Sequence, residues 1–216
     1  MNQDQTKHLE TLTEIRDLMN RSSRFISLSG LSGVFAGIYA LIGMGLAYFY
    51  LGRSPFEPGT PYYEAARGMR RFGLDHLTFF FIVGMGVLVM AIGTGIFFTT
   101  RKAKKKGQRI WDGLTRRLLT HLLIPLVAGG FFCLGLYYHG VTGFIAPATL
   151  IFYGLALVSA SKYTYDDVKY LGIIEVGLGC LAMFYLGYGL EFWGLGFGFF
   201  HIIYGILMWY KYERGN

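Results

Sequence analysis

At residues 101–106 the chain reads Arg101-Lys-Ala-Lys-Lys-Lys106, and Arg109, Arg116 and Arg117 continue this basic stretch. One long apolar run precedes it and another follows it. Charged residues make up 15% of the chain, against about a quarter in a soluble domain, and long blocks contain almost none. A bilayer selects such blocks as transmembrane helices, so we predict a membrane protein whose orientation is set by this basic stretch.

The apolar blocks predict an all-α, polytopic membrane bundle with six spans over residues 26–216. The expected spans cover about residues 26–51, 77–100, 118–139, 141–161, 168–188 and 190–210. Span 1 carries a row of small residues, which lets another helix approach closely; its members are Ser29, Gly33 and Gly37. Pro125 and Pro147 stand inside spans and are expected to kink them.

Two further helices are predicted outside the spans. Residues 1–25 place apolar residues on one face of a helix and mix acidic with basic residues, which is typical of an amphipathic helix. This helix is expected in the cytoplasm, either lying along the membrane or docking a partner. In the loop 52–75, Thr60-Pro61 resembles a helix start, and an interfacial helix over residues 62–72 is expected.

The distribution of Lys and Arg predicts the topology. With both termini inside, the inner segments hold 16 of the 20 basic residues and the outer loop 52–75 holds four. This asymmetry obeys the positive-inside rule and predicts a bacterial inner-membrane protein with both termini cytoplasmic. Segment 101–117 has a formal charge of +7. It is expected to contact anionic lipid rather than nucleic acid, because no nucleic-acid-binding motif accompanies it.

Similar sequences close the three odd-numbered spans. They read Leu46-Ala-Tyr-Phe-Tyr-Leu-Gly52, Leu134-Gly-Leu-Tyr-Tyr-His-Gly140 and Leu181-Ala-Met-Phe-Tyr-Leu-Gly187. The even-numbered spans 4 and 6 also contain similar sequences. Span 4 reads Ile151-Phe-Tyr-Gly-Leu155 and span 6 reads Ile202-Ile-Tyr-Gly-Ile206. We therefore predict three tandem two-helix hairpins around a pseudo-threefold axis, as parallel repeats occur in transporters. The alternative to a repeat is that these similarities arise by chance in a sequence rich in Phe, Tyr, Leu and Gly.

Glu175 and His201 are the ionisable residues predicted at depth in the membrane. At 1.5 Å per residue they lie about 10 and 14 Å from the inner ends of spans 5 and 6, so they can meet. Tyr153 and Tyr204 fall near the same layer. Such a group can relay a proton or bind a substrate or cation. The alternative is a buried polar pair that specifies helix packing.

A second candidate group lies at the outer surface, where Asp75, His76, His139 and Glu191 have matched depths. Two histidines with carboxylates are a ligand set for zinc or another divalent metal. Haem ligation would need the same two histidines to lie close together. The sequence itself does not identify any cofactor.

Several catalytic classes have no support in the sequence. It contains no serine-nucleophile motif, phosphate loop, HExxH or paired catalytic carboxylates. Cys133 and Cys180 form no CxxC pair. Three classes remain: a transporter or a small-molecule, ion or lipid-binding protein with a central polar site, a membrane metal or redox enzyme with an outer-face site, and a regulatory or scaffold protein. We favour the first, and a homo-oligomer is compatible with all three.

From Ser23 onward the chain resembles an uncharacterised bacterial family of six-span inner-membrane proteins. The matching stretches are residues 21–25, 27–33, 95–106 and 145–154. The resemblance implies a six-span fold and no established activity. Similar proteins are often given the automatic label of carotene oxygenase, which implies an iron site built from several histidines. The histidines here fall on two membrane faces and do not support that label.

Overall fold

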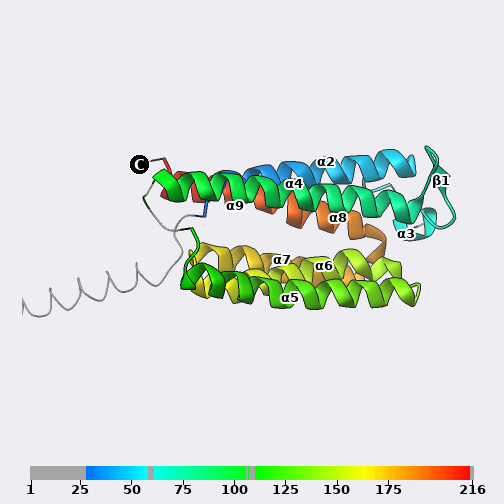
Figure 1. The fold of residues 1–216 in the computed structure, drawn as a ribbon. Coiled ribbons are helices and arrows are strands. Elements are labelled where there is room, and N and C mark those ends of the chain that lie inside the picture. The colour runs from blue at the N-terminus through cyan, green and yellow to red at the C-terminus, as the bar shows by residue number, and fades with distance from the viewer. Residues whose placement is uncertain (1–27, 58–60, 106, 108–109, 215–216) are drawn as a thin grey trace, which may run out of the picture.

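The computed structural model describes residues 28–57, 61–105, 107 and 110–214, which form a bundle of helices (Figure 1). The prediction of an all-α bundle is confirmed. Among the described residues the exception is a short antiparallel ribbon of two strands with two residues each. The amphipathic helix predicted for residues 1–25 lies outside this part of the chain.

The long helices of the bundle are α2 (Gly30–Leu51), α4 (His76–Lys105), α5 (Gly113–Tyr138), α6 (Ile145–Ala160) and α7 (Asp167–Phe184). The last rod is continuous over residues 186–212. It joins a 3-10 turn (Leu186–Tyr188), α8 (Gly189–Trp193), a π-helical segment (Gly194–Phe200) and α9 (His201–Tyr212). The shorter elements are α3 (Tyr62–Ala65), β1 (Arg70–Arg71), β2 (Leu74–Asp75) and the 3-10 turns Thr142–Phe144 and Ser161–Tyr163.

Five segments of the described chain are long and apolar enough to cross a membrane. They are Gly30–Leu51, His76–Lys105, Gly113–Tyr138, Thr142–Tyr163 and Leu186–Tyr212. The sixth predicted span coincides with α7, whose 18 residues include the charged residues Asp167, Lys169 and Glu175. These three charges set α7 apart from the five segments, so the sixth span stays a prediction.

The helices form two groups that lie side by side (Figure 1). One group contains α2, α4 and α9, with α2 packed on both others; the second contains α5, α6 and α7, with α6 in the middle. The groups meet where α6 and α7 contact the last rod. Two of the predicted hairpin pairs, α2 with α4 and α5 with α6, do pack on each other, but α6 also packs extensively on α7, and α2 on α9, which are not hairpin pairs. The hairpin repeat and its threefold axis therefore stay predictions.

Glycines bring the backbones of neighbouring helices together. A Cβ on Gly33 would lie 3.2 Å from Gly205 Cα, and one on Gly37 would lie 2.6 Å from Gly198 O. The prediction that the small-residue row of span 1 admits another helix is thus confirmed, and the partner is the last rod. Between α6 and α7, Gly154 and Gly172 face each other's carbonyl oxygens in the same way.

The bundle end that carries α3, β1 and β2, called here the hairpin end, differs from the sequence prediction. The helix expected over residues 62–72 is wrong beyond Ala65, because Gly68 has a φ of +75° and the chain turns back. Phe72 and Gly73, with φ values of +55° and +77°, form the two-residue turn between β1 and β2. Arg71 then donates hydrogen bonds to Phe49 O and Tyr50 O, two carbonyl oxygens in the last turn of α2.

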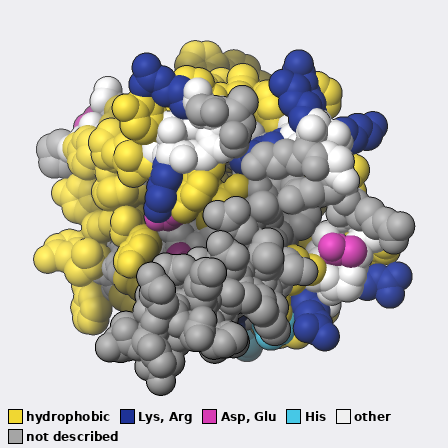
Figure 2. All heavy atoms as spheres, turned by 90° about the vertical axis from the view of Figure 1, so that its left-hand side faces the viewer, with side chains coloured by type: hydrophobic (Ala, Val, Ile, Leu, Met, Phe, Trp, Pro, Cys, Tyr) yellow, Lys and Arg dark blue, Asp and Glu magenta, His cyan; other side chains and the backbone are white. Residues whose placement is uncertain are grey.

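The opposite end, called the basic end, carries the connection from α4 to α5. Helix α4 continues through the basic stretch to Lys105, five residues beyond the predicted boundary. Cations suit this position because the C-terminus of a helix carries partial negative charge. Figure 2 shows Lys and Arg side chains standing around the edge of this end, with hydrophobic side chains covering the flank beside them.

The two prolines occupy different positions in their helices. Pro125 lies inside α5, as predicted. Pro147 is the third residue of α6, where a backbone N–H has no partner within the helix, so it costs no helical hydrogen bond. Its carbonyl instead lies against Gly179 of α7.

Candidate functional site

The structure brings Glu175 and His201 together in the middle of the bundle. Glu175 lies on α7 with 0% of its surface exposed, and His201 begins α9 with 5% exposed. The His201 Nδ1 atom is 3.2 Å from Glu175 Oε1. Because α7 and α9 belong to different helix groups, this ion pair connects the two groups near the centre.

Tyr153 of α6 completes the contacts of the imidazole. Its hydroxyl lies 2.9 Å from His201 Nε2, and the two ring centroids are 5.4 Å apart. The other ring nitrogen, Nδ1, lies 3.1 Å from Gly196 O. If Nδ1 carries the proton, it donates to Gly196 O, and Tyr153 donates to Nε2. In the imidazolium form both nitrogens donate, and Tyr153 becomes the acceptor.

Tyr204, the fourth predicted member, lies one turn further along α9. It packs with Tyr153 against a buried apolar cluster that includes Leu157 and Met208. Its hydroxyl is buried and has no hydrogen-bond partner among the described residues. The structure therefore joins Glu175, His201 and Tyr153 directly and leaves Tyr204 beside them.

The Glu175 carboxylate is poorly satisfied for a buried acid. Neither oxygen has a hydrogen-bond partner among the described residues, although Oε1 is within ion-pair distance of His201. The short distance and the missing hydrogen bond are compatible, because the N–H of Nδ1 points to Gly196 O and not to the carboxylate. An isolated carboxylate in an apolar interior is strongly unfavourable. Two net-neutral states of the pair remain: a carboxylate with an imidazolium, or a carboxylic acid with a neutral imidazole.

The π-helical segment shapes this site. Its glycines Gly194, Gly196 and Gly198 are all buried, and a Cβ on Gly196 would collide with Glu175 Oε2. A larger residue at position 196 would therefore require the Glu175 carboxylate and the Leu150 side chain to move. Sequence reasoning did not find this feature. The signal was the run Gly194-Leu-Gly-Phe-Gly198, which ends two residues before His201, and π-helical turns are frequent at functional sites.

The four residues predicted as an outer metal site are used separately. Asp75 accepts hydrogen bonds from Thr78 Oγ1 (2.7 Å) and Thr78 N (3.1 Å), which holds the pKa of its carboxyl below the usual value. Glu191 Oε1 accepts from Phe56 N at 3.2 Å. His76 begins α4, and His139 is exposed at the end of α5. Within the described residues, no group of three or more His, Cys, Asp or Glu side chains is placed to hold a metal ion.

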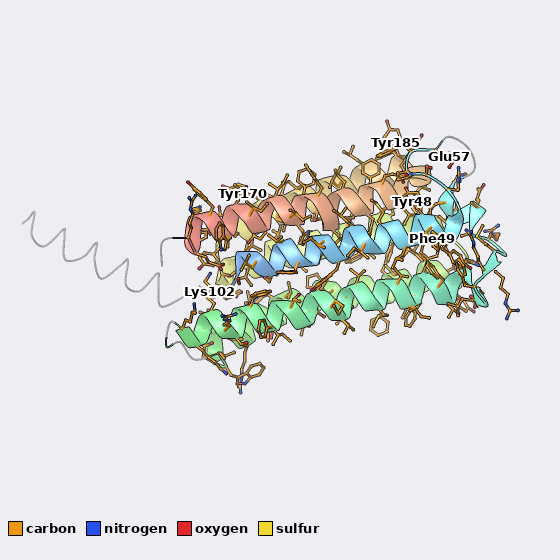
Figure 3. All side chains as sticks on the ribbon, turned by 90° about the horizontal axis from the view of Figure 1, so that it is seen from above. Tyr48, Phe49, Glu57, Lys102, Tyr170 and Tyr185 are labelled. Carbon is orange, nitrogen blue, oxygen red and sulfur yellow. The ribbon has the colours of Figure 1, made fainter. Side chains whose placement is uncertain are left out.

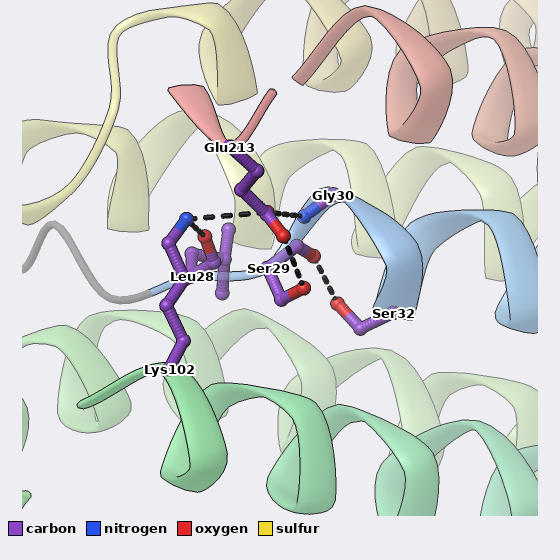
Figure 4. A network of polar contacts seen from close by, with 6 residues as sticks. All are labelled: Leu28, Ser29, Gly30, Ser32, Lys102 and Glu213. Atoms are coloured by element: carbon purple, nitrogen blue, oxygen red, sulfur yellow. Dashed lines mark hydrogen bonds and ion pairs between the residues drawn. The ribbon is translucent and has the colours of Figure 1, made fainter. Parts of the chain in front are cut away.

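A second ion pair, which sequence reasoning missed, lies at the basic end (Figure 4). Glu213 accepts from Gly30 N at 2.6 Å and Ser29 Oγ at 3.2 Å, and it pairs with Lys102 Nζ at 3.2 Å. Lys102 also donates to Leu28 O at 2.6 Å. The negative side chain thus covers the positive N-terminus of α2, a stabilising arrangement. One lysine of the predicted lipid-facing stretch is therefore used inside the protein.

Comparisons with known proteins add no relative. No protein-family model, curated protein or solved structure matches this chain. The resemblance to a six-span bacterial family stays a prediction, and function has to be argued from the site itself.

Proposed function

We propose that this chain is an integral membrane protein that couples the binding or transport of a small molecule or ion to a proton held by Glu175 and His201. The observation that carries the proposal is the fully buried Glu175 carboxylate, which has an imidazole 3.2 Å away and no hydrogen-bond donor among the described residues. Ionisable residues among membrane helices are costly and commonly mark substrate or proton pathways.

The tight packing around Glu175 favours a proton over a larger bound species. Its Oε2 atom lies against the Gly196 backbone, and Leu150 fills the neighbouring space. A proton moving between Glu175 and His201 needs no extra room. The imidazole can pass the proton on through Tyr153, whose hydroxyl both donates and accepts.

The position of the pair between the helix groups supports a coupling role. Glu175 comes from the group of α5, α6 and α7, and His201 from the group of α2, α4 and α9. Loss of the proton from the imidazolium removes the attraction across this boundary, which biases how the groups pack. Protonation of a buried histidine is a known way to drive such two-state rearrangements.

Six spans with both termini cytoplasmic are part of the proposal. Helix α7 is about 27 Å long at 1.5 Å per residue, close to the thickness of the hydrocarbon core. Its charged Asp167 lies at the basic end and pairs with Lys211 at 2.9 Å, so this charge stays near the surface. The basic connection 101–117 would then face the anionic lipids of the cytoplasmic leaflet in a bacterial inner membrane.

The test measures proton flux in proteoliposomes that contain a pH-sensitive dye. A membrane potential is imposed, and mixtures of small metabolites and salts are added outside. We expect compound-dependent proton flux for the wild-type protein. Glu175→Gln and His201→Ala should reduce this flux to the level of empty liposomes. Glu64→Gln, which changes an exposed carboxylate of α3, is the matched control and should keep full flux.

Two results would overturn the proposal. Full flux in both Glu175→Gln and His201→Ala would exclude the central pair. A wild-type protein that moves no proton with any mixture would exclude proton coupling altogether.

A further inference from the structure

Two adjoining cavities lie at the hairpin end, away from the central pair. A polar cavity of about 70 Å³ is lined by residues that include Tyr48, Arg53, Glu57 and Tyr62. An apolar groove of about 580 Å³ is lined by residues that include Leu41, Met44, Phe56, Phe192, Leu195 and Phe199. Tyr188 and Glu191 line both spaces, so the two adjoin at these residues. Figure 3 shows Tyr48 and Glu57 at this end of the bundle.

The polar cavity contains buried oxygen atoms without partners. The Tyr48 hydroxyl lies beside the Glu191 carboxylate. Glu191 Oε2 and the Tyr48 oxygen are both inaccessible to solvent, and neither makes a hydrogen bond of good geometry with a described residue. Tyr48 as a whole is 8% exposed. Glu191 Oε1 is already held by Phe56 N, which fixes the carboxylate with Oε2 left over. A carboxylate only accepts hydrogen bonds, so the missing partner must be a donor.

The charges around the polar cavity favour a cationic donor. Glu57 and Glu191 supply two carboxylates and Arg53 supplies one guanidinium. Burial raises the pKa of Tyr62, and Tyr63 and Glu191 raise it further, so this hydroxyl stays neutral. The net charge of the lining is therefore negative. The volume suits an ammonium group, since about 10 to 15 Å³ is enough for one water.

The apolar groove continues from the polar cavity toward the middle of the bundle. From Glu191 to Phe199 the last rod advances about 12 Å, and from Tyr48 back to Leu41 helix α2 covers about 10 Å. Phe199, Leu195 and Phe56 are 51%, 40% and 70% exposed, so the groove opens on the flank of the bundle. A polar head at the bundle end with a chain pointing inward is the orientation of a lipid in one leaflet.

We propose that the polar cavity and the apolar groove together bind one phospholipid with a primary-amine head, its ammonium on Glu191 Oε2 and one acyl chain in the groove. The amine supplies the donors that Glu191 lacks, and the Tyr48 hydroxyl accepts from the same group. This site is independent of the proton site proposed for Glu175 and His201.

Native mass spectrometry of the full-length protein in detergent tests the proposal. Phosphatidylethanolamine and phosphatidylcholine with the same acyl chains are titrated separately. They differ in the head nitrogen, where three methyl groups replace three N–H donors. We expect one phosphatidylethanolamine to bind about tenfold more tightly than phosphatidylcholine, a typical effect of one charge-assisted hydrogen bond. Free phosphoethanolamine should not displace it, because it lacks the chain that fills the groove.

Substitutions connect the preference to the cavity. Glu191→Gln should bring the two lipids within about twofold of each other, because the amide loses the charge. Tyr48→Phe should reduce the preference to about threefold, and it carries the test if Glu191→Gln does not fold. Glu64→Gln is the control and should keep the full preference.

Three outcomes would overturn the proposal. Equal binding of both lipids by the wild-type protein would mean annular lipid only. An unchanged preference in folded Glu191→Gln and Tyr48→Phe would place the site elsewhere. Displacement by free phosphoethanolamine would exclude the groove.

Discussion

Among the described residues, a buried acid–base pair at the centre and a partly buried one at the basic end differ in how well the acid is satisfied. At the basic end, Glu213 receives hydrogen bonds from Gly30 N, Ser29 Oγ and Lys102 Nζ. At the centre, Glu175 has an imidazole 3.2 Å away and no hydrogen bond from the described residues. Glu175 is nevertheless the more deeply buried, with 0% of its side chain exposed against 15% for Glu213.

This difference separates the Lys102–Glu213 pair, whose contacts are structural, from the Glu175–His201 pair, whose burial needs another explanation. The contacts of Glu213 account for its presence, because each one joins the C-terminal end of α9 to α2 or α4. The surroundings of Glu175 do not repay the cost of burying a carboxylate, and buried pairs without good hydrogen bonds are often destabilising. A residue that costs stability at this depth is best explained by a role in proton or ion chemistry.

The comparison predicts stability effects of different size for the same substitution. Glu213→Gln should lower the free energy of unfolding by about 2 to 3 kcal/mol, because Lys102 keeps its charge while its partly buried, charged partner is lost. Glu175→Gln should change it by less than about 1 kcal/mol, since His201 can release its proton and become neutral. Thermal unfolding of the detergent-solubilised protein, followed by tryptophan fluorescence, measures both.

Glu64→Gln serves as the exposed control in that experiment and should leave the unfolding temperature unchanged. Equal destabilisation by Glu175→Gln and Glu213→Gln would remove the distinction and make the central pair structural.

The second prediction concerns the link from Tyr153 to His201. Tyr153→Phe removes the hydroxyl 2.9 Å from Nε2 and keeps the ring packing. We expect a loss of about 1 kcal/mol in stability, because one buried ring nitrogen loses its partner. If Tyr153 passes the proton on, flux in proteoliposomes should also fall, whereas a packing role would leave the flux unchanged. Tyr204→Phe is the matched control, since that hydroxyl has no partner among the described residues.

The parts of the fold that follow from local composition could be predicted from the sequence. Hydropathy placed five apolar segments within a few residues of their observed ends. The spacing of Gly33 and Gly37 predicted a close helix contact, which the last rod provides. The helix predicted over residues 62–72 was wrong because the backbone is left-handed at Gly68 and Phe72, which the amphipathic pattern does not indicate. Pairing of α6 with α7 depends on three-dimensional packing that local patterns do not contain.

The candidate site shows the same division. The depths of Glu175 and His201 follow from helix rise, so their meeting could be predicted. The pair of Lys102 and Glu213 joins residues 111 positions apart, and nothing near either residue indicates the other. The polar cavity at Tyr48 and Glu191 likewise depends on how the loop 52–57 folds over α8.

The smallest predicted effect concerns an exposed acid that, like Glu213, lies at a helix N-terminus. Asp112 caps α5 by accepting from Thr115 N at 2.7 Å, and this hydrogen bond holds the pKa of its carboxyl below the usual value. A lowered pKa in the folded protein means that the stabilisation is present above the unfolded pKa, about 3.9, and is lost as the pH falls through the folded value. Asp112→Asn should therefore cost less than about 1 kcal/mol at pH 7, since the site is exposed. Unfolding temperatures of Asp112→Asn and wild type should converge at a pH below the folded pKa of Asp112, where the wild-type carboxyl is protonated. A difference that persists at that pH would show that the cap acts through geometry and not through charge, and Glu213 would then be the better measure of how charge stabilises this end of the bundle.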